Sequence, residues 1–283
     1  MSITEKTINV GKLQWFYREA SGSSDNLPVL LLHGIPAHSF SWREVLSCLS
    51  NQGYRAIAPD WIGSGFSAKP ERRDFAYTPE AYITALAELI AALELEQFHL
   101  VVQGFLGSVG LQYALAHPEQ IERLIILNTP LSKHAKLPWQ MKLWGTPFVG
   151  DMLTQDPLLV DRTLEKGSGF VIADDNLAIY RKPFLQSSAV GRALVATTKN
   201  LQLATAMAEI ESGFSRWDKP TLLIWGMKDP WLPATEAEQL AASRPNVEMV
   251  QLPEAKHYPQ EHWSTEIGET IIYFFRRQVF AKD

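Results

Sequence analysis

The chain has 283 residues, which is enough for one large domain or for a core with an inserted subdomain. Hydrophobic residues make up 46% of it and charged residues 20%, a composition that argues against intrinsic disorder. The net charge is −5 and no basic stripe alternates with aromatic residues, so nucleic acid is not an expected partner.

The cysteine content and the N-terminus indicate the compartment. Cys48 is the single cysteine, which excludes an intramolecular disulfide and a cysteine-rich metal site. The first residues, 1–6, have no apolar core of the kind a signal peptide needs, and no apolar run reaches the roughly 18 residues that span a bilayer. We therefore expect a soluble, cytoplasmic protein without a membrane span. The histidines lack metal-ligand spacing such as His-Glu-x-x-His, so we expect neither metal nor cofactor.

Strand-like and helix-like patterns alternate through the first part of the chain, residues 1–130. Short apolar or alternating runs predict strands, and apolar spacing of three and four residues predicts helices. The predicted strands are 12–17, 28–32, 54–59, 98–103 and 121–127, and the predicted helices are 42–49, 80–95 and 107–116. Thr78 and Pro79 are typical of a helix start, as cap and first helical residue.

A sharp turn between the strand 98–103 and the helix from Gly107 is the centre of the predicted site. A strand that runs directly into a helix presents the residue at the turn above the edge of the sheet. In this chain the residue at the apex is Gly104, which has no side chain and cannot act as a nucleophile. Moving the apex to Phe105 or Leu106 gives no nucleophile either.

The regular alternation stops at residue 131 and resumes near Pro220. The intervening segment, which we assign as 131–213, is rich in apolar and aromatic residues and too long for a bare loop. We predict an inserted helical cap there. The last part, 214–283, returns to core elements, with strands at 220–225 and 247–252 and helices at 235–242 and 264–280. Alternating strands and helices predict an α/β fold, with a mostly parallel sheet covered on both faces.

Several loops, taken in order, resemble those of the α/β-hydrolase superfamily, and within it the haloalkane dehalogenase and epoxide hydrolase branch. They are His33-Gly34-Ile35-Pro36, similar to the oxyanion loop; Asp60-Trp61-Ile62-Gly63-Ser64-Gly65-Phe66-Ser67; Tyr180-Arg181-Lys182-Pro183-Phe184 in the cap; Trp225-Gly226-Met227-Lys228-Asp229-Pro230; and Ala255-Lys256-His257-Tyr258-Pro259-Gln260-Glu261. The resemblance implies an eight-stranded, mostly parallel sheet, with Asp229 as the triad acid and His257 as the triad base. It also implies that His33 and the Asp60 loop have structural roles.

The chain departs from this branch at the turn. Members of the branch carry an Asp nucleophile there, and related esterases carry a Ser, where this chain has Gly104. Phe105 and Ile35 occupy positions where dehalogenases place halide-binding Trp and Asn, so that function is not carried over. The Gln-Gly-Phe-Leu run also resembles that of α/β-hydrolase-like proteins from cyanobacteria and plant plastids, a likeness that implies no activity.

His257 and Asp229 are the predicted catalytic pair, because a histidine oriented by a buried carboxylate can exchange protons near neutral pH. The alternative is a hydrogen-bonded pair without turnover. Backbone N–H groups of Ile35 and Phe105 are the predicted oxyanion donors, since such a site needs no particular side chain. Ser108 is the nearest hydroxyl, but one turn into a helix it is expected to bond back to a carbonyl.

Two hypotheses about function follow. In the first, a small hydrophobic molecule binds under the cap, and His257 and Asp229 act on it as a non-covalent general base, in a hydrolase or a lyase. In the second, the protein is a catalytically inactive ligand-binding or scaffold protein, with a small molecule in its pocket or a protein partner on its surface. Conventional haloalkane dehalogenase, epoxide hydrolase or serine esterase activity is not expected. The candidates for the pocket wall are Trp139, Trp144, Phe148, Phe184 and Trp231.

Overall fold

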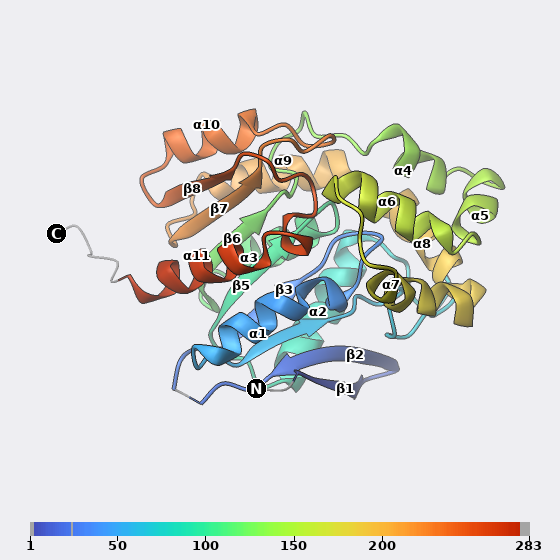
Figure 1. The fold of residues 1–283 in the computed structure, drawn as a ribbon, viewed down its shortest axis with the longest axis horizontal. Coiled ribbons are helices and arrows are strands. Elements are labelled where there is room, and N and C mark those ends of the chain that lie inside the picture. Colours follow the sequence, from blue (N-terminus) through green and yellow to red (C-terminus); the bar gives the residue numbers. More distant parts are fainter. Residues whose placement is uncertain (1–2, 24, 278–283) are drawn as a thin grey trace.

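The computed structural model describes residues 3–23 and 25–277, in which eight strands form one sheet. Its strand order is β1-β2-β4-β3-β5-β6-β7-β8 (Figure 1). The strands are β1 (Ile3–Val10), β2 (Leu13–Ala20), β3 (Val29–Leu32), β4 (Ala56–Pro59), β5 (Phe98–Gln103), β6 (Ile121–Leu127), β7 (Thr221–Gly226) and β8 (Val247–Leu252). The pairs from β4 through β8 are parallel, and the β1–β2 and β2–β4 pairs are antiparallel. The predicted eight-stranded, mostly parallel sheet is therefore confirmed.

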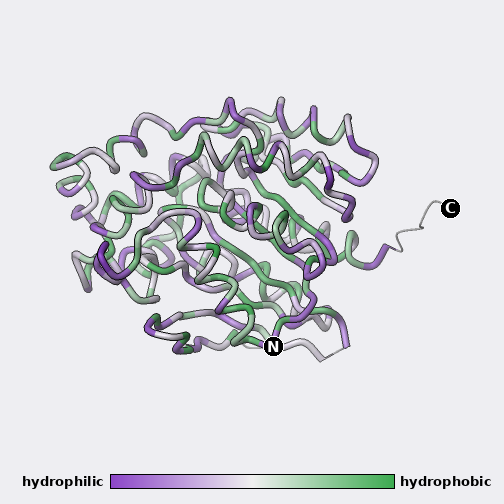
Figure 2. Tube along the Cα trace, turned by 180° about the vertical axis from the view of Figure 1, so that it is seen from behind, coloured by the Kyte–Doolittle hydropathy of each residue, from purple (hydrophilic) through white to green (hydrophobic). Residues whose placement is uncertain are grey.

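Six helices cover the two faces of the sheet. They are α1 (Arg43–Asn51), α2 (Pro79–Ala92), α3 (Gly107–Ala116), α9 (Leu203–Phe214), α10 (Thr235–Ser243) and α11 (Ser264–Arg276). Val29 and Leu31 of β3 pack in one apolar cluster with α1 and α11, whereas Leu30 and Leu32 pack in another with α2, α3, α9 and α10. Successive side chains of a strand point to opposite faces, so a parallel strand covered on both sides is apolar throughout. Figure 2 shows these apolar strands running through the interior.

The predicted start of α2 is confirmed. Thr78 precedes the helix in an extended conformation, and its side-chain oxygen accepts a hydrogen bond from the backbone N–H of Ala81. Pro79 is the first helical residue, where its missing N–H removes no helical hydrogen bond. The helix holds the loop that precedes it against the core.

The inserted segment between β6 and β7 consists of further helices, which gather at one end of the sheet (Figure 1). They are α4 (Trp139–Trp144), α5 (Val149–Thr154), α6 (Leu158–Ser168), α7 (Asp174–Gln186) and α8 (Ser188–Asn200). The helix α9, which the assignment 131–213 includes, instead packs on α3 of the core, and Gly213 lies against Leu115. The last six residues of the range 214–283, 278–283, lie outside the described residues.

Candidate active site

Gly104 lies at the turn between β5 and α3, in a left-handed backbone conformation with φ of +71°. A Cβ atom built on Gly104 would lie 3.0 Å from Cα of Gly34 and 3.5 Å from Nε2 of His257. The position that a side chain would take at this apex therefore faces the histidine. The geometry agrees with the sequence-based assignment of Gly104 to the apex.

His257 follows β8 and is completely buried. Its Nδ1 lies 2.7 Å from Oδ2 of Asp229, and a carboxylate can only accept, so Nδ1 carries the proton and Nε2 the lone pair. Within the described residues Nε2 has no hydrogen-bond partner. The pair thus presents a buried, oriented proton acceptor to the turn at Gly104.

Asp229 is held by four donors. Its Oδ1 accepts hydrogen bonds from the backbone N–H groups of Trp231 and Leu232, and its Oδ2 accepts from Asn128 Nδ2 at 2.8 Å as well as from His257. Asn128 also accepts a hydrogen bond from the N–H of Gly226 through its Oδ1, so its amide orientation is fixed. With every lone pair occupied, the carboxylate is fixed in the orientation that meets Nδ1.

Asn128 is a positioning residue that the sequence interpretation did not identify. It is the first residue after β6, and it is fully buried with a positive φ of +37°. The signal for it is a polar residue at the carboxyl end of an apolar strand, the edge where sites of parallel sheets assemble. Gln103, the last residue of β5, carries the same signal.

Gln103 and Tyr258 tie together the loops around the turn. Gln103 accepts a hydrogen bond from the N–H of Gly34 at 3.2 Å and donates one to the carbonyl oxygen of His257 at 2.8 Å. The Tyr258 hydroxyl donates to the carbonyl oxygen of Ile35 at 2.8 Å. Burial raises the pKa of Tyr258 well above its ordinary value, so the hydroxyl stays protonated as a donor.

The two predicted oxyanion donors flank the turn. Both Ile35 and Phe105 are buried, and within the described residues neither backbone N–H donates a hydrogen bond. The ring of Phe105 stacks on the imidazole of His257, with 5.4 Å between ring centres and 29° between planes. The structure therefore brings Gly104, His257, Ile35 and Phe105 into one place.

The loops that contain His33 and Asp60 are held together by buried hydrogen bonds next to the candidate site. His33 Nε2 accepts a hydrogen bond from the N–H of Trp61, which links the two loops. Burial lowers the pKa of His33, so its ring is neutral. Asp60 accepts hydrogen bonds from the backbone N–H groups of Ser39 and Phe66. Burial alone would raise the pKa of Asp60, but the nearby rings of His38 and His33 and the side chain of Ser39 hold it below its ordinary value.

Ser108 behaves as its position one turn into α3 predicts. It is fully buried, and its hydroxyl donates to the carbonyl oxygen of Phe105 at 2.8 Å. A hydroxyl bonded back to the preceding turn is fixed away from the apex and has its donor occupied. The geometry gives Ser108 a packing role in α3.

Comparison with known proteins identifies the family of this chain. A model described as alpha/beta hydrolase fold matches residues 28–262. This chain belongs to the α/β-hydrolase fold family. Haloalkane dehalogenase 1 of Mycobacterium tuberculosis is 30% identical over 257 residues, which cover 87% of this chain and 82% of that protein. Haloalkane dehalogenase 2 of the same species is 29% identical over 256 residues, covering 88% of this chain and 87% of that protein. The chain thus lies in the haloalkane dehalogenase-like branch.

Solved structures agree with this placement. The haloalkane dehalogenase DbeA from Bradyrhizobium elkani superposes with a TM-score of 0.85 over 97% of this chain and 98% of that chain. Its sequence identity is 24%, so this likeness shows the fold alone. The structure of DBJA gives a TM-score of 0.84 at 25% identity, over 97% of each chain.

A cavity of about 380 Å³ lies next to the candidate site of this α/β-hydrolase-fold protein. Helices α4, α5 and α6 form most of its wall, and Trp231 closes it on the side of the core. The ring of Trp231 is 4.7 Å from that of His257, edge to face, so one side chain contacts both the cavity and the histidine. Neither Gly104 nor His257 lines the cavity itself.

The structure brings together three of the five residues predicted to line a pocket. Trp139, Trp144 and Trp231 line this cavity. Phe148 does not, because its side chain points to solvent and is 88% exposed. Phe184 packs among apolar residues of the cap and core, away from the cavity. Aromatic composition alone does not distinguish a residue that lines a pocket from one on the outer surface of a cap.

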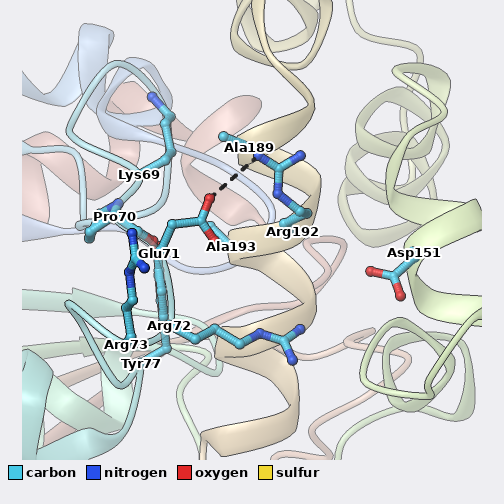
Figure 3. Close-up of a pocket in the computed structure, with 10 residues that line it drawn as sticks. All are labelled: Lys69, Pro70, Glu71, Arg72, Arg73, Tyr77, Asp151, Ala189, Arg192 and Ala193. Atoms are coloured by element: carbon cyan, nitrogen blue, oxygen red, sulfur yellow. Dashed lines mark hydrogen bonds and ion pairs between the residues drawn. The ribbon is translucent and has the colours of Figure 1, made fainter.

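A second, polar cavity of about 610 Å³ lies where the cap meets the loop before α2 (Figure 3). Charged side chains from both sides line it, and Arg192 of α8 approaches Glu71 of the core loop at 4.0 Å. Both partners are at least half exposed, so this ion pair contributes little to holding the cap on the core. None of the predicted site residues lies in this cavity.

Among residues 3–23 and 25–277, no three side chains of His, Cys, Asp or Glu gather in a group that could hold a metal ion. In that same part of the chain, no helix has the length and apolar character needed to cross a bilayer.

Proposed function

We propose that this protein binds a small apolar molecule between cap and core, and that His257 acts on it by non-covalent acid–base chemistry. The apex of the turn, Gly104, offers no atom that could form an ester or acyl intermediate. Dehalogenase, epoxide hydrolase and serine esterase chemistry of the conventional kind is therefore not part of the proposal. The single cysteine and its intermediate exposure fit the reducing cytoplasm, where we place the protein.

One observation carries this proposal. The Nε2 atom of His257 is buried, has no partner within the described residues, and faces the side-chain position of Gly104. Leaving a buried polar atom unpaired costs about 1–3 kcal/mol, and a catalytic role is one explanation for such a group in a native structure. A lone pair fixed in this orientation by Asp229 is the arrangement of a general base.

The proposed step needs only this chain's own residues and a water or acidic proton on the ligand. Nε2 takes that proton, and the imidazolium that forms is stabilised by the Asp229 carboxylate on Nδ1. In hydrolysis the water oxygen bonds to the carbonyl carbon, and the negative charge moves to the carbonyl oxygen. The N–H groups of Ile35 and Phe105 then donate to that oxygen. When the carbonyl re-forms, the bond from its carbon to the leaving group breaks, and Nε2 returns the proton to the leaving group.

A specific observation also supports the second candidate function, binding without turnover. His257 and Phe105 are 0% exposed, so a ligand in the cavity beside Trp231 meets the histidine only if Trp231 moves. In that case His257 and Asp229 would have a structural role, either in the wall of a binding site or in a scaffold protein.

The substitution His257→Ala separates the two functions. Turnover of a panel of p-nitrophenyl esters with short acyl chains should fall at least 100-fold in the variant, as loss of a general base typically costs 10²–10⁴-fold. Binding of 1-octanol, followed by tryptophan fluorescence, should change little. Equal turnover in both proteins would eliminate the acid–base role. Ligand binding with no turnover in either would establish the binding function instead.

A further inference from the structure

The cavity beside Trp231 has an apolar interior and a charged edge. Its apolar wall comes mainly from Trp139, Met141, Trp144, Leu153, Leu159 and Trp231. Its volume of about 380 Å³ is within the usual range of small-molecule sites. Such a wall favours an apolar body, because burial removes apolar surface from water.

Among the residues that the structure describes, two cations complete the wall and no carboxylate does. Arg162 and Lys166 are four residues apart on α6, so they lie one above the other on the same face of the helix. The cavity is therefore lined with positive charge in a chain whose net charge is −5. An anionic group would be attracted to this edge.

The acidic residues of α6 are engaged away from the cavity. Asp161 lies 3.4 Å from the Arg181 guanidinium of α7. Glu165 accepts a hydrogen bond from the backbone N–H of Ile172. The carboxylate of Asp156, which does not line the cavity, pairs with Arg162.

Lys166 differs from Arg162 because its ammonium is unpaired. It forms no ion pair or hydrogen bond with any of the described residues. An ammonium with three free donors at the edge of an apolar cavity offers a carboxylate a charge-assisted hydrogen bond. Arg162, one helical turn away, is already paired with Asp156, so Lys166 carries the unpaired charge of this edge.

We propose that the ligand of this cavity is an apolar carboxylate, whose hydrocarbon part lies among the tryptophans and whose carboxylate binds Lys166. This proposal rests on the proposed function, because it uses the same cavity as the binding site. It goes further by assigning the ligand a charge, a polar end and an orientation. The carboxylate lies at the edge of the cavity, and the opposite end of the ligand points toward Trp231 and His257.

Octanoate and 1-octanol form the test pair, because they share a hydrocarbon chain and differ in charge. We expect octanoate to bind the wild-type protein about fivefold more tightly at low ionic strength, the scale of a partly exposed charge pair. Lys166→Gln should remove this preference and leave the affinity for 1-octanol unchanged. Lys142→Gln, at a lysine of α4 that does not line the cavity, is the matched control and should keep the preference.

The outcomes separate the two proposals. If wild type binds 1-octanol as tightly as octanoate, or if Lys166→Gln keeps the preference, the carboxylate assignment is wrong while the apolar binding site stands. If the protein binds neither ligand, the proposed function and this inference are both wrong. In 0.5 M NaCl the preference should shrink, because salt screens an exposed pair.

Discussion

The side-chain amide of Gln103 lies 2.8 Å from the carbonyl oxygen of His257 and joins the turn to the histidine loop. Its oxygen also accepts the N–H of Gly34, so one buried side chain fixes the loops on both sides of Gly104. The candidate site is thus held by β5 itself, through the last residue of that strand.

Replacing Gln103 by leucine should destabilise the protein. The substitution keeps the approximate shape but leaves the Gly34 N–H and the His257 carbonyl buried and unpaired. Each unpaired group costs about 1–3 kcal/mol. Urea unfolding should report the loss, with Gln97→Leu as control. Gln97 is exposed and its bond to Glu119 is long, so that variant should stay within about 0.5 kcal/mol. Equal stability of the two variants would contradict the bridging role.

Gly104 gives a second prediction, about both stability and reactivity. Gly104→Ala and Gly104→Ser should each lower the free energy of unfolding by about 1–3 kcal/mol, since φ is +71° and a Cβ would lie 3.0 Å from Gly34 Cα. Only the serine variant should be labelled by a fluorophosphonate probe, because its hydroxyl would lie beside Nε2 of His257. Mass spectrometry of the labelled protein is the measurement.

Two controls make the labelling result decisive. The double variant Gly104→Ser with His257→Ala should lose the label, which would show that the histidine activates the new hydroxyl. The wild-type protein should remain unlabelled. A covalent adduct on the wild type, at any residue of the turn, would contradict the assignment of non-covalent chemistry.

Seven of the eight strands among the described residues and the positions of Gly104, Asp229 and His257 were predictable, because strand patterns and loop motifs are local in the sequence, whereas β1 was not predicted. Asn128 and Gln103 were not identified, although each follows or ends an apolar strand. Their roles depend on which strands become neighbours, as β5, β6 and β7 do here. That pairing is a property of the whole sheet.

The cap was harder to predict than the core. Aromatic residues in 131–213 indicated packing, but whether each one faces inward depends on the angles between short helices. Trp144 is buried and lines the cavity, whereas Phe148, four residues on, is exposed. The strained turn at Phe148 separates α4 from α5, so the spacing of four residues does not place Trp144 and Phe148 on one helix face. No periodicity in the sequence indicates this break.

His99 should make the free energy of unfolding fall as the pH becomes acidic. Burial, with a further contribution from Arg123, lowers the pKa of His99 to about 3, and burial lowers the pKa of His38 to about 4. Unfolded histidines have a pKa of about 6.5, so below that pH the unfolded chain binds protons that the folded chain does not. Stability should therefore fall as pH drops from about 6.5 toward 4, by about 1.4 kcal/mol per pH unit for each histidine.

The variant His99→Phe tests this pH dependence. His99 stacks on Phe275 with 4.0 Å between ring centres, and its Nδ1 is buried without a partner among the described residues. A phenyl ring keeps the stacking and removes the titrating group, so the acid-side slope should fall by about 1.4 kcal/mol per pH unit. Urea unfolding from pH 4.5 to 8 measures it. At pH 8, where His99 is neutral in both states, the variant should be at least as stable as wild type. An unchanged slope below pH 6 would refute the prediction.

Phe148 lies at the centre of a γ-turn between α4 and α5. Its φ is +64°, and the N–H of Val149 donates to the carbonyl oxygen of Pro147 at 2.7 Å. This conformation is strained for a residue with a side chain, by about 1–3 kcal/mol, and glycine adopts it freely at an entropic cost of about 0.5–1 kcal/mol. Because Phe148 is 88% exposed, little packing is lost. Phe148→Gly should therefore raise the free energy of unfolding by about 1 kcal/mol. Val171→Gly, at an equally exposed residue without a positive φ, should lower it, and a similar loss in both variants would argue against strain at Phe148.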